Sequence, residues 1–228
     1  MPRETLDNKI KHLKDEILIL DSMVEQSILE SVQALKKRDI VAAQRIYDAD
    51  KQVNTRRFEI ENECMVTLAT QQPIMAHDLR LLASILEVTS ELERMGDYAK
   101  GIAHICLVIG NQTPVKPLID IPRMADLAVS MLNRAVDAFI NSNVYLARSI
   151  PPEDDQIDQL YNQVYRELVT IMFTDPSTID QANYLMWAAH NLERLADRVT
   201  NICERTIYAA TGVMEEFLTS NDEWIYPK

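Results

Sequence analysis

Apolar side chains recur every three or four residues along most of the chain, which is the spacing of one face of an α-helix. The first run extends from about residue 4 to residue 38 and has a narrow apolar seam. Its members include Leu6, Ile10, Leu13, Ile17, Leu20 and Val24. Similar runs follow from Ala43 to Leu68 and from Leu82 to Cys106. The pattern therefore predicts three long helices in the first half of the chain.

Proline and glycine mark where these helices are expected to end. Pro73 pushes the residue before it away from helical dihedral angles, so the second helix should end near residue 72. Gly110 is a natural C-cap for the third helix. Residues 111–122 contain three prolines and form the only clear linker in the sequence.

The second half of the chain shows the same kind of pattern. Helical spacing over residues 124–138 predicts a fourth helix, and a fifth is expected over 143–173. A Pro-Pro pair should kink or interrupt the first turns of the fifth helix. Asp175 followed by Pro176 is a start signal for a sixth helix. Gly212 is expected to end it.

The two halves also match each other in sequence. Residues 191–197, NLERLAD, align with residues 91–97, ELERMGD. A constant offset upstream gives the pairs Val32/Val136, Ala34/Ala138, Ala43/Ala147, Ile46/Ile150 and Asp50/Asp154. An internal repeat explains these matches better than chance. The sequence therefore predicts two three-helix units, over residues 1–112 and 120–228, joined by a linker at 113–119.

Composition agrees with a helical, soluble protein. Hydrophobic residues make up 47% of the chain and only four glycines are present. The formal net charge of -12 disfavours nucleic-acid binding, which depends on Lys and Arg meeting phosphates. We expect neither a secretory signal nor a membrane span, because no apolar leader and no long uncharged apolar stretch is visible. Cys64, Cys106 and Cys203 are predicted to be buried thiols in a reducing compartment.

Acidic and amide side chains recur in pairs four residues apart, which puts both members on one helix face. The pairs are Asp50/Asn54, Glu93/Asp97, Asp154/Asp158 and Glu193/Asp197. Like charges at this spacing cost an isolated helix about 0.2–0.5 kcal/mol per pair, so their repetition needs a reason. If the helices are neighbours, the carboxylates converge and suit magnesium, manganese, calcium or iron. The alternative is ordinary solvated acids paired with Arg94 and Arg194.

Other chemistry is weakly indicated. No Glu-x-x-His motif occurs, which argues against a ferritin-like di-iron enzyme. His77, His104 and His190 are single histidines on helices, and such residues are more often surface or capping groups than metal ligands. No nucleophile–base pair or glycine-rich phosphate loop is visible. We therefore expect a protein that is not an enzyme.

Three segments resemble the PhoU family. They are QQPIMAHDLR at 71–80, ELERMGDYA at 91–99 and LERLADRVTNI at 192–202. The resemblance covers nearly the whole chain, and it implies an all-α fold of two tandem antiparallel three-helix bundles. It further implies a cytoplasmic negative regulator of the phosphate-starvation response and phosphate uptake. Such a protein acts between the ATPase of a phosphate ABC transporter and a sensor histidine kinase, and reaches the membrane only through these partners.

The resemblance also implies metal clusters on the bundle surface, bound by an acid and an Asp four residues later, and a homodimer. Divalent or trivalent ions such as iron, manganese, magnesium or zinc are the candidates. The implied ligands are Asp50, Asn54, Glu93, Asp97, Asp154, Asp158, Glu193, Asp197 and Asn201. Two departures weaken the first site, because Asn54 replaces an acid and Gly101 stands where the second repeat has Asn201. We therefore expect the second site, continued by Glu204, to be the stronger one.

Two other functions remain open from the sequence. A carboxylate-bridged metalloenzyme or metal store in a helical bundle would use the same acidic pairs. An accessory protein of a different phosphate carrier would share the resemblance. Oxygen reactivity of the iron-loaded protein would favour the enzyme, because an adaptor needs only surface metal sites.

Overall fold

The computed structural model describes residues 3–71 and 73–217, and every regular element in these ranges is helical. The long helices are α1 (Arg3–Lys37), α2 (Ile40–Thr70), α3 (Ala76–Ile109), α4 (Asp120–Ile140), α6 (Asp154–Thr174) and α7 (Ile179–Thr211). The short elements are α5 (Val144–Ser149) and the 3₁₀ turns η1 (Pro151–Glu153) and η2 (Pro176–Thr178). The predicted all-α fold is confirmed.

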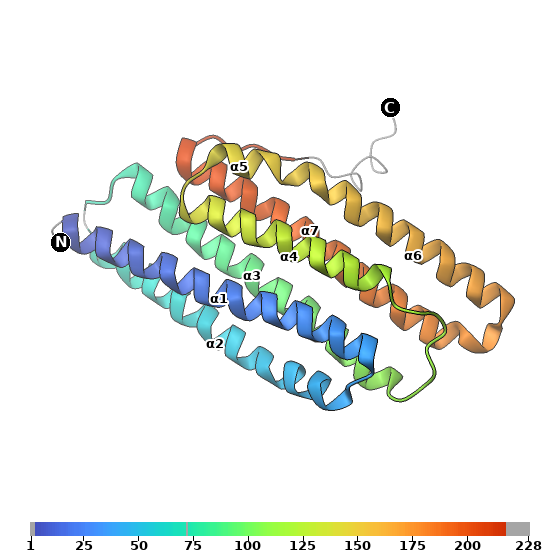
Figure 1. Cartoon of the computed structure of the whole chain (residues 1–228). Helices are drawn as coiled ribbons and strands as arrows, with labels where there is room; N and C mark the ends of the chain where they lie inside the picture. Colours follow the sequence, from blue (N-terminus) through green and yellow to red (C-terminus); the bar gives the residue numbers. More distant parts are fainter. Residues whose placement is uncertain (1–2, 72, 218–228) are drawn as a thin grey trace.

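The helices form two bundles that lie side by side (Figure 1). Helices α1, α2 and α3 pack on one another, and α4, α6 and α7 do the same in the second half. The bundles meet where α3 packs along α7 and α1 packs along α4, so one hydrophobic core runs through both. The predicted tandem arrangement of three-helix bundles is confirmed. The predicted boundaries at 1–112, 113–119 and 120–228 stay predictions, and residues 1–2 and 218–228 lie outside the described residues.

Local signals in the sequence fix most helix ends. The carboxylate of Asp39 accepts a hydrogen bond from the Ala42 backbone N–H at 2.9 Å and caps α2. Gly212 ends α7 in a left-handed conformation with φ 79°, which glycine adopts without strain. The Asp175 carboxylate accepts from the Ser177 N–H at 3.0 Å and caps the turn that leads into α7. Helix α2 ends at Thr70, and residue 72, where its end was expected, lies outside the described residues.

Prolines explain the two places where helix bounds differ from simple periodicity. Helix α4 begins at Asp120, before Pro122, although the sequence placed Pro122 in the linker. The first turn of a helix tolerates proline because its N–H groups have no intrahelical acceptor. The expected fifth helix is interrupted at Pro151 and Pro152, which form a 3₁₀ turn between α5 and α6. This interruption matters because α6 then begins at an acidic residue, Asp154.

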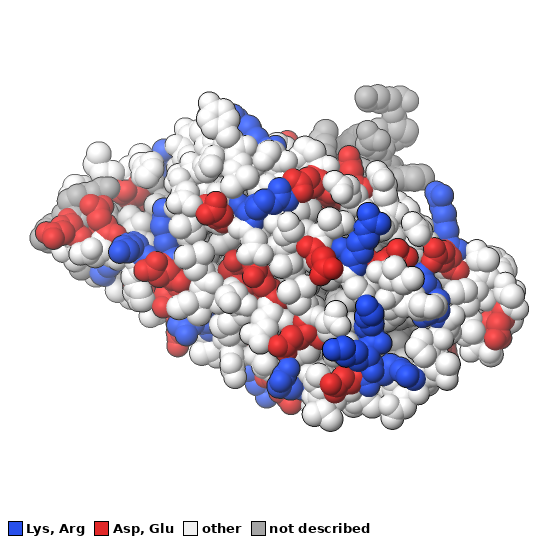
Figure 2. Space-filling view, in the orientation of Figure 1, with Lys and Arg blue, Asp and Glu red and all other residues white. Residues whose placement is uncertain are grey.

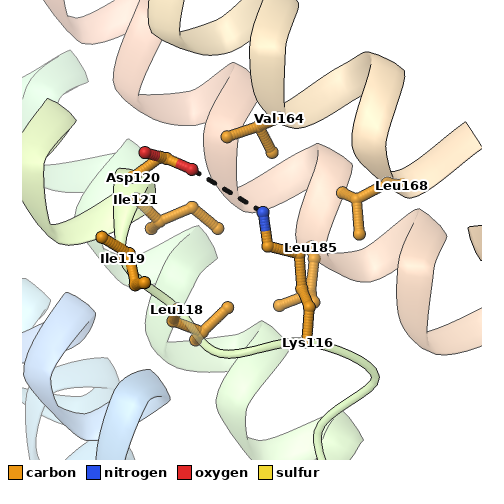
Figure 3. A pocket seen from close by; sticks show the side chains of 8 residues that line it. All are labelled: Lys116, Leu118, Ile119, Asp120, Ile121, Val164, Leu168 and Leu185. Carbon is orange, nitrogen blue, oxygen red and sulfur yellow. Dashed lines mark ion pairs between the residues drawn. The ribbon is translucent and has the colours of Figure 1, made fainter.

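The linker is fastened to the second bundle by polar contacts. The side chain of Gln181 on α7 accepts from the Val115 N–H at 2.6 Å and donates to the Thr113 carbonyl at 3.1 Å. The Lys116 ammonium pairs with Glu167 on α6 and lies 3.7 Å from the Asp120 carboxylate. A small hollow lies between the linker and the second bundle. Figure 3 shows Lys116 and Asp120 beside the apolar side chains that line it. They come from the linker, α4, α6 and α7: Leu118, Ile119, Ile121, Val164, Leu168 and Leu185.

Close packing and ion pairs join α3 to α7. A Cβ added at Gly101 would lie 2.8 Å from the side-chain amide nitrogen of Asn191 on α7, so a larger residue here would displace that side chain. Arg205 pairs with Glu87, and an Arg198 nitrogen lies 3.6 Å from a Glu91 oxygen. Gly101 therefore faces the Asn191 side chain at the interface between the repeats.

Surface and core agree with the remaining sequence expectations. Cys64, Cys106 and Cys203 are buried and free, as predicted. None of the helices in the described part of the chain combines the length and apolar character that a membrane crossing requires. Figure 2 shows acidic and basic side chains interspersed over the face seen in Figure 1. Lys and Arg gather near the end of α1, whose last turn contains Lys36 and Lys37.

Candidate metal centre

Two rows of acidic and amide side chains lie along equivalent helix pairs. Asp50 and Asn54 lie on α2, next to Glu93 and Asp97 on α3, and we call these four residues the first seam. The second seam comprises Asp154 and Asp158 on α6 with Glu193 and Asp197 on α7. Within each seam the carboxylates influence one another electrostatically across the two helices. The acids of each seam therefore lie close enough across two helices for the charge of one to raise the pKa of another.

The first seam is neutralised by the protein's own cations. The Lys100 ammonium lies 2.7 Å from Asp50 Oδ2 and 3.9 Å from Asp97 Oδ1. Arg57 Nη1 lies 3.0 Å from Glu93 Oε1. The Asn54 amide donates to Asp50 Oδ2 at 3.1 Å, so its nitrogen, not its oxygen, faces the carboxylate. Each carboxylate of the first seam thus has a cation within 4 Å, and Arg57 also pairs with Glu61 at 2.7 Å.

Lys100 and Arg57 were not recognised as seam residues from the sequence, although a signal was present. Lys100 follows Asp97 by three residues, which places it on the same helix face. The hydrogen bond to Asp50 raises the pKa of Lys100 and keeps it charged. A basic residue three positions after the second acid of a pair is therefore an indication that the chain neutralises that pair itself.

The second seam is more buried, and the cations that act on Asp197, Arg194 and Arg198, both lie on α7 itself. The Asp197 side chain is 17% exposed, against 54% for Asp97. Asp154 is 3% exposed, and neither of its carboxylate oxygens has a hydrogen-bond partner. Arg194 Nη1 lies 3.1 Å from Asp197 Oδ2 and supplies partial compensation. Arg198 pairs instead with Glu91 across the repeat interface.

Burial and mutual repulsion raise the pKa values of two carboxylates in the second seam. Burial, followed by the charges of Asp158, Asp197 and Glu193, raises the pKa of Asp154 to about 8. Burial and the charge of Glu193 raise the pKa of Asp197 to about 6, although Arg194 opposes the shift. Negative charge in this seam is therefore costly unless a cation enters it.

The repeat explains why the seams differ. The position of Arg57 in the first repeat corresponds to Tyr161 in the second, and that of Lys100 corresponds to Thr200. Both cations of the first seam are thus replaced by neutral residues. The second seam therefore keeps its acids without the two cations that face the first seam.

Two further residues were predicted to extend the second site. Asn201 lies one turn beyond Asp197 and is partly buried. Its counterpart, Gly101, faces α7, so this position points toward the repeat interface, and a role for Asn201 as a ligand stays a prediction. Glu204 accepts a hydrogen bond from the Phe217 backbone N–H at 2.8 Å, so the segment after α7 already engages this carboxylate.

The donor set fits a hard or borderline cation, but the ligands are not assembled around one point. Over residues 3–71 and 73–217, no three His, Cys, Asp or Glu side chains are grouped closely enough to hold a metal ion. The unpartnered carboxylate of Asp154 fits an oxygen-binding ion. A bound ion would require the other carboxylates of the second seam to move toward Asp154.

The raised pKa of Asp154 predicts how stability depends on pH in the metal-free protein. Between its ordinary value of 3.8 and about 8, the folded protein keeps a proton that the unfolded chain has released. The free energy of unfolding therefore falls as pH rises through this window. Asp154→Asn removes the ionisation, so its stability advantage over the wild type should grow by a few kcal/mol between about pH 5 and pH 8.

Urea unfolding in the presence of a chelator measures this difference. Asp155→Asn is the matched control, because Asp155 is exposed and its charge is the smallest cause of the raised pKa of Asp154, so the pH dependence should change far less. An advantage of Asp154→Asn that stays constant with pH would show that Asp154 ionises normally.

The fold and the two seams together define a class of protein. It is all-helical, it contains a three-helix bundle twice, and each bundle carries one row of acidic side chains between two of its helices. A family model for the PhoU domain matches the chain twice, over residues 17–106 and 121–206. The chain belongs to the PhoU family.

Relatives and solved structures agree with this assignment over most of the chain. A PhoU homolog from Clostridium acetobutylicum, named a phosphate-specific transport system accessory protein, is 34% identical and covers 93% of this chain and 97% of its own. PhoU from Escherichia coli K12 is 31% identical over 90% of this chain and 84% of its own. The crystal structure of PhoU from Pseudomonas aeruginosa superposes with a TM-score of 0.85 at 31% identity, covering 91% and 99% of the two chains. That of the phosphate transport system regulatory protein PhoU from Streptococcus pneumoniae gives 0.85 at 31% identity, covering 93% and 100%.

Proposed function

We propose that this protein is a regulatory accessory of a phosphate transport system and represses the phosphate-starvation response when phosphate is plentiful. In this role it works in the cytoplasm as an adaptor between the transporter ATPase and a sensor histidine kinase, as a homodimer. It performs no catalysis itself. The observation that carries the proposal is the end-to-end match in fold and sequence to accessory and regulatory proteins of phosphate transport.

Metal binding at the second seam is the physical part of this proposal. The buried, unpartnered Asp154 carboxylate and the raised pKa values of Asp154 and Asp197 support it. A bound divalent ion would supply positive charge that relieves this repulsion. By mass action it would then stabilise the folded form, in which α6 and α7 are held together. The role that follows is to fix the shape of the surface that docks partners.

Deleting the gene tests the regulatory role. In phosphate-replete cells the deletion should raise expression from a phosphate-starvation promoter severalfold, because the kinase is no longer restrained. Wild-type protein supplied in trans should restore repression, and a variant with both Glu193 and Asp197 replaced by alanine should restore it poorly. Repression that persists in the deletion strain would contradict the proposed function. Repression fully restored by the double variant would contradict only the role given to the metal.

A further inference from the structure

The residues within the next two helical turns beyond the acids differ between the two seams. In the second repeat an aromatic cluster follows, made of Tyr161 and Tyr165 on α6 with Trp187 and His190 on α7. The equivalent positions in the first repeat are Arg57, Glu61, Glu87 and Ser90. The second seam therefore ends at an imidazole, and the first ends at a hydroxyl and an ion-paired guanidinium.

The imidazole of His190 is held against the acids by its neighbours. Its ring centroid lies 6.0 Å from that of Tyr161 and 6.0 Å from that of Trp187, which meets it edge-on at 73°. His190 Nδ1 lies 3.2 Å from Glu193 Oε2, and the side chain is 41% exposed. The ring is thus oriented by two aromatic contacts with one nitrogen directed at the seam.

The 3.2 Å between His190 Nδ1 and Glu193 Oε2 matches the distance between two ligand atoms that bind one metal ion. Ligand atoms about 2.1 Å from a metal, at tetrahedral or octahedral angles, are separated by roughly 3.0–3.4 Å. Asp154 gives an independent indication of a ligand, because it is almost fully buried next to Glu193 and its oxygens have no partner. His190 and Glu193 are therefore already spaced as two members of one coordination shell.

We propose that His190 Nδ1 is a ligand of the metal ion in the second seam and makes this seam select borderline cations over magnesium. The proposal rests on the proposed metal binding and adds to it the class of ion. Imidazole suits zinc, iron, copper and nickel, whereas magnesium favours oxygen ligands and water. The first repeat has Ser90 at this place and lacks the selectivity.

The alternative role of His190 is a simple ion pair with Glu193, which a protonated imidazole would make without any metal. A ligand and an ion-pair partner differ in two measurable ways. Only a ligand discriminates between zinc and magnesium, and only a ligand places a nitrogen in the coordination shell. His190→Gln keeps hydrogen-bonding capacity but removes the imidazole.

The test compares wild type, His190→Gln and His104→Gln in titrations with zinc and with magnesium. His104 is the matched control, since it lies on α3 with its ring 5.8 Å from that of Tyr47. His190→Gln should weaken zinc binding at least tenfold and change magnesium binding less than twofold, while His104→Gln changes neither. Thermal melting monitored by circular dichroism confirms that each variant is folded.

Pulsed electron paramagnetic resonance of the manganese-loaded protein gives the second readout. The wild type should show nitrogen modulation from a coordinated imidazole, and His190→Gln should lose it while still binding manganese. Manganese binding without nitrogen modulation in the wild type, or an equal loss of zinc and magnesium in the variant, overturns the assignment of His190 alone. A wild type that binds neither zinc nor manganese overturns the proposed metal centre as well.

Discussion

Replacing Glu193 and Asp197 together by alanine is expected to remove most of the manganese that the protein binds, weakening its affinity at least tenfold. The same double change at Glu93 and Asp97 should have a much smaller effect. The reason is that the acids of the two seams differ in their positively charged partners. Lys100 and Arg57 already pair with acids of the first seam, and neutral residues replace them in the second. Equilibrium dialysis with metal analysis of the two double variants measures the effect.

The two double variants are matched controls for each other. They remove the same two residue types from equivalent helices, α3 and α7, so any general cost of losing helical acids is shared. In the presence of a chelator the variant at Glu193 and Asp197 should melt at or above the wild-type temperature, because the repulsion around Asp154 is relieved. Equal metal loss from both variants, or greater loss from the first seam, would show that the ranking of the seams is wrong.

Phe139→Ala is expected to destabilise the protein by about 3–5 kcal/mol, since it empties a large buried site. Phe139 lies on α4, is 1% exposed and belongs to the core that runs through both bundles. Phe173→Ala is the matched control, because Phe173 is 86% exposed on α6, and it should change stability by less than about 0.5 kcal/mol. Urea unfolding monitored by helical circular dichroism compares them. Similar losses would contradict the packing described for the second bundle.

Much of this fold could be predicted because it is set by local pattern. Helical periodicity, the Asp175-Pro176 start and the glycine at 212 are short-range signals, and each has its counterpart in the structure. The Pro151–Pro152 interruption was likewise visible. The start of α4 was placed too late because three prolines read as one linker, although Pro122 fits the first turn of a helix without losing a hydrogen bond.

The candidate site was predicted only in part. Spacing alone places Glu93 and Asp97, or Glu193 and Asp197, on one face, and the repeat pairs them with α2 and α6. Spacing does not give burial, which depends on how neighbouring helices pack, and burial is what separates Asp97 from Asp197. Spacing also places His190 three residues from Glu193 on α7, but it does not give the contact of the His190 ring with Tyr161 on α6.

The two repeats differ in how the charge of their acidic side chains is balanced. In the first seam, ion pairs of Lys100 with Asp50 and of Arg57 with Glu93 link α2 to α3 without an added ion. The second seam holds four acids between α6 and α7 with weaker compensation. Metal would then control only one half of the molecule, and partner docking that responds to metal is expected on that half.

The most direct measurement is anomalous diffraction from crystals of the protein soaked with manganese. The account predicts an anomalous peak between α6 and α7, within about 2.0–2.5 Å of carboxylate oxygens from Asp154 and its neighbours in the second seam. A peak found only in the first seam, beside Lys100 and Arg57, or no peak at either seam in crystals that contain bound manganese, would contradict it.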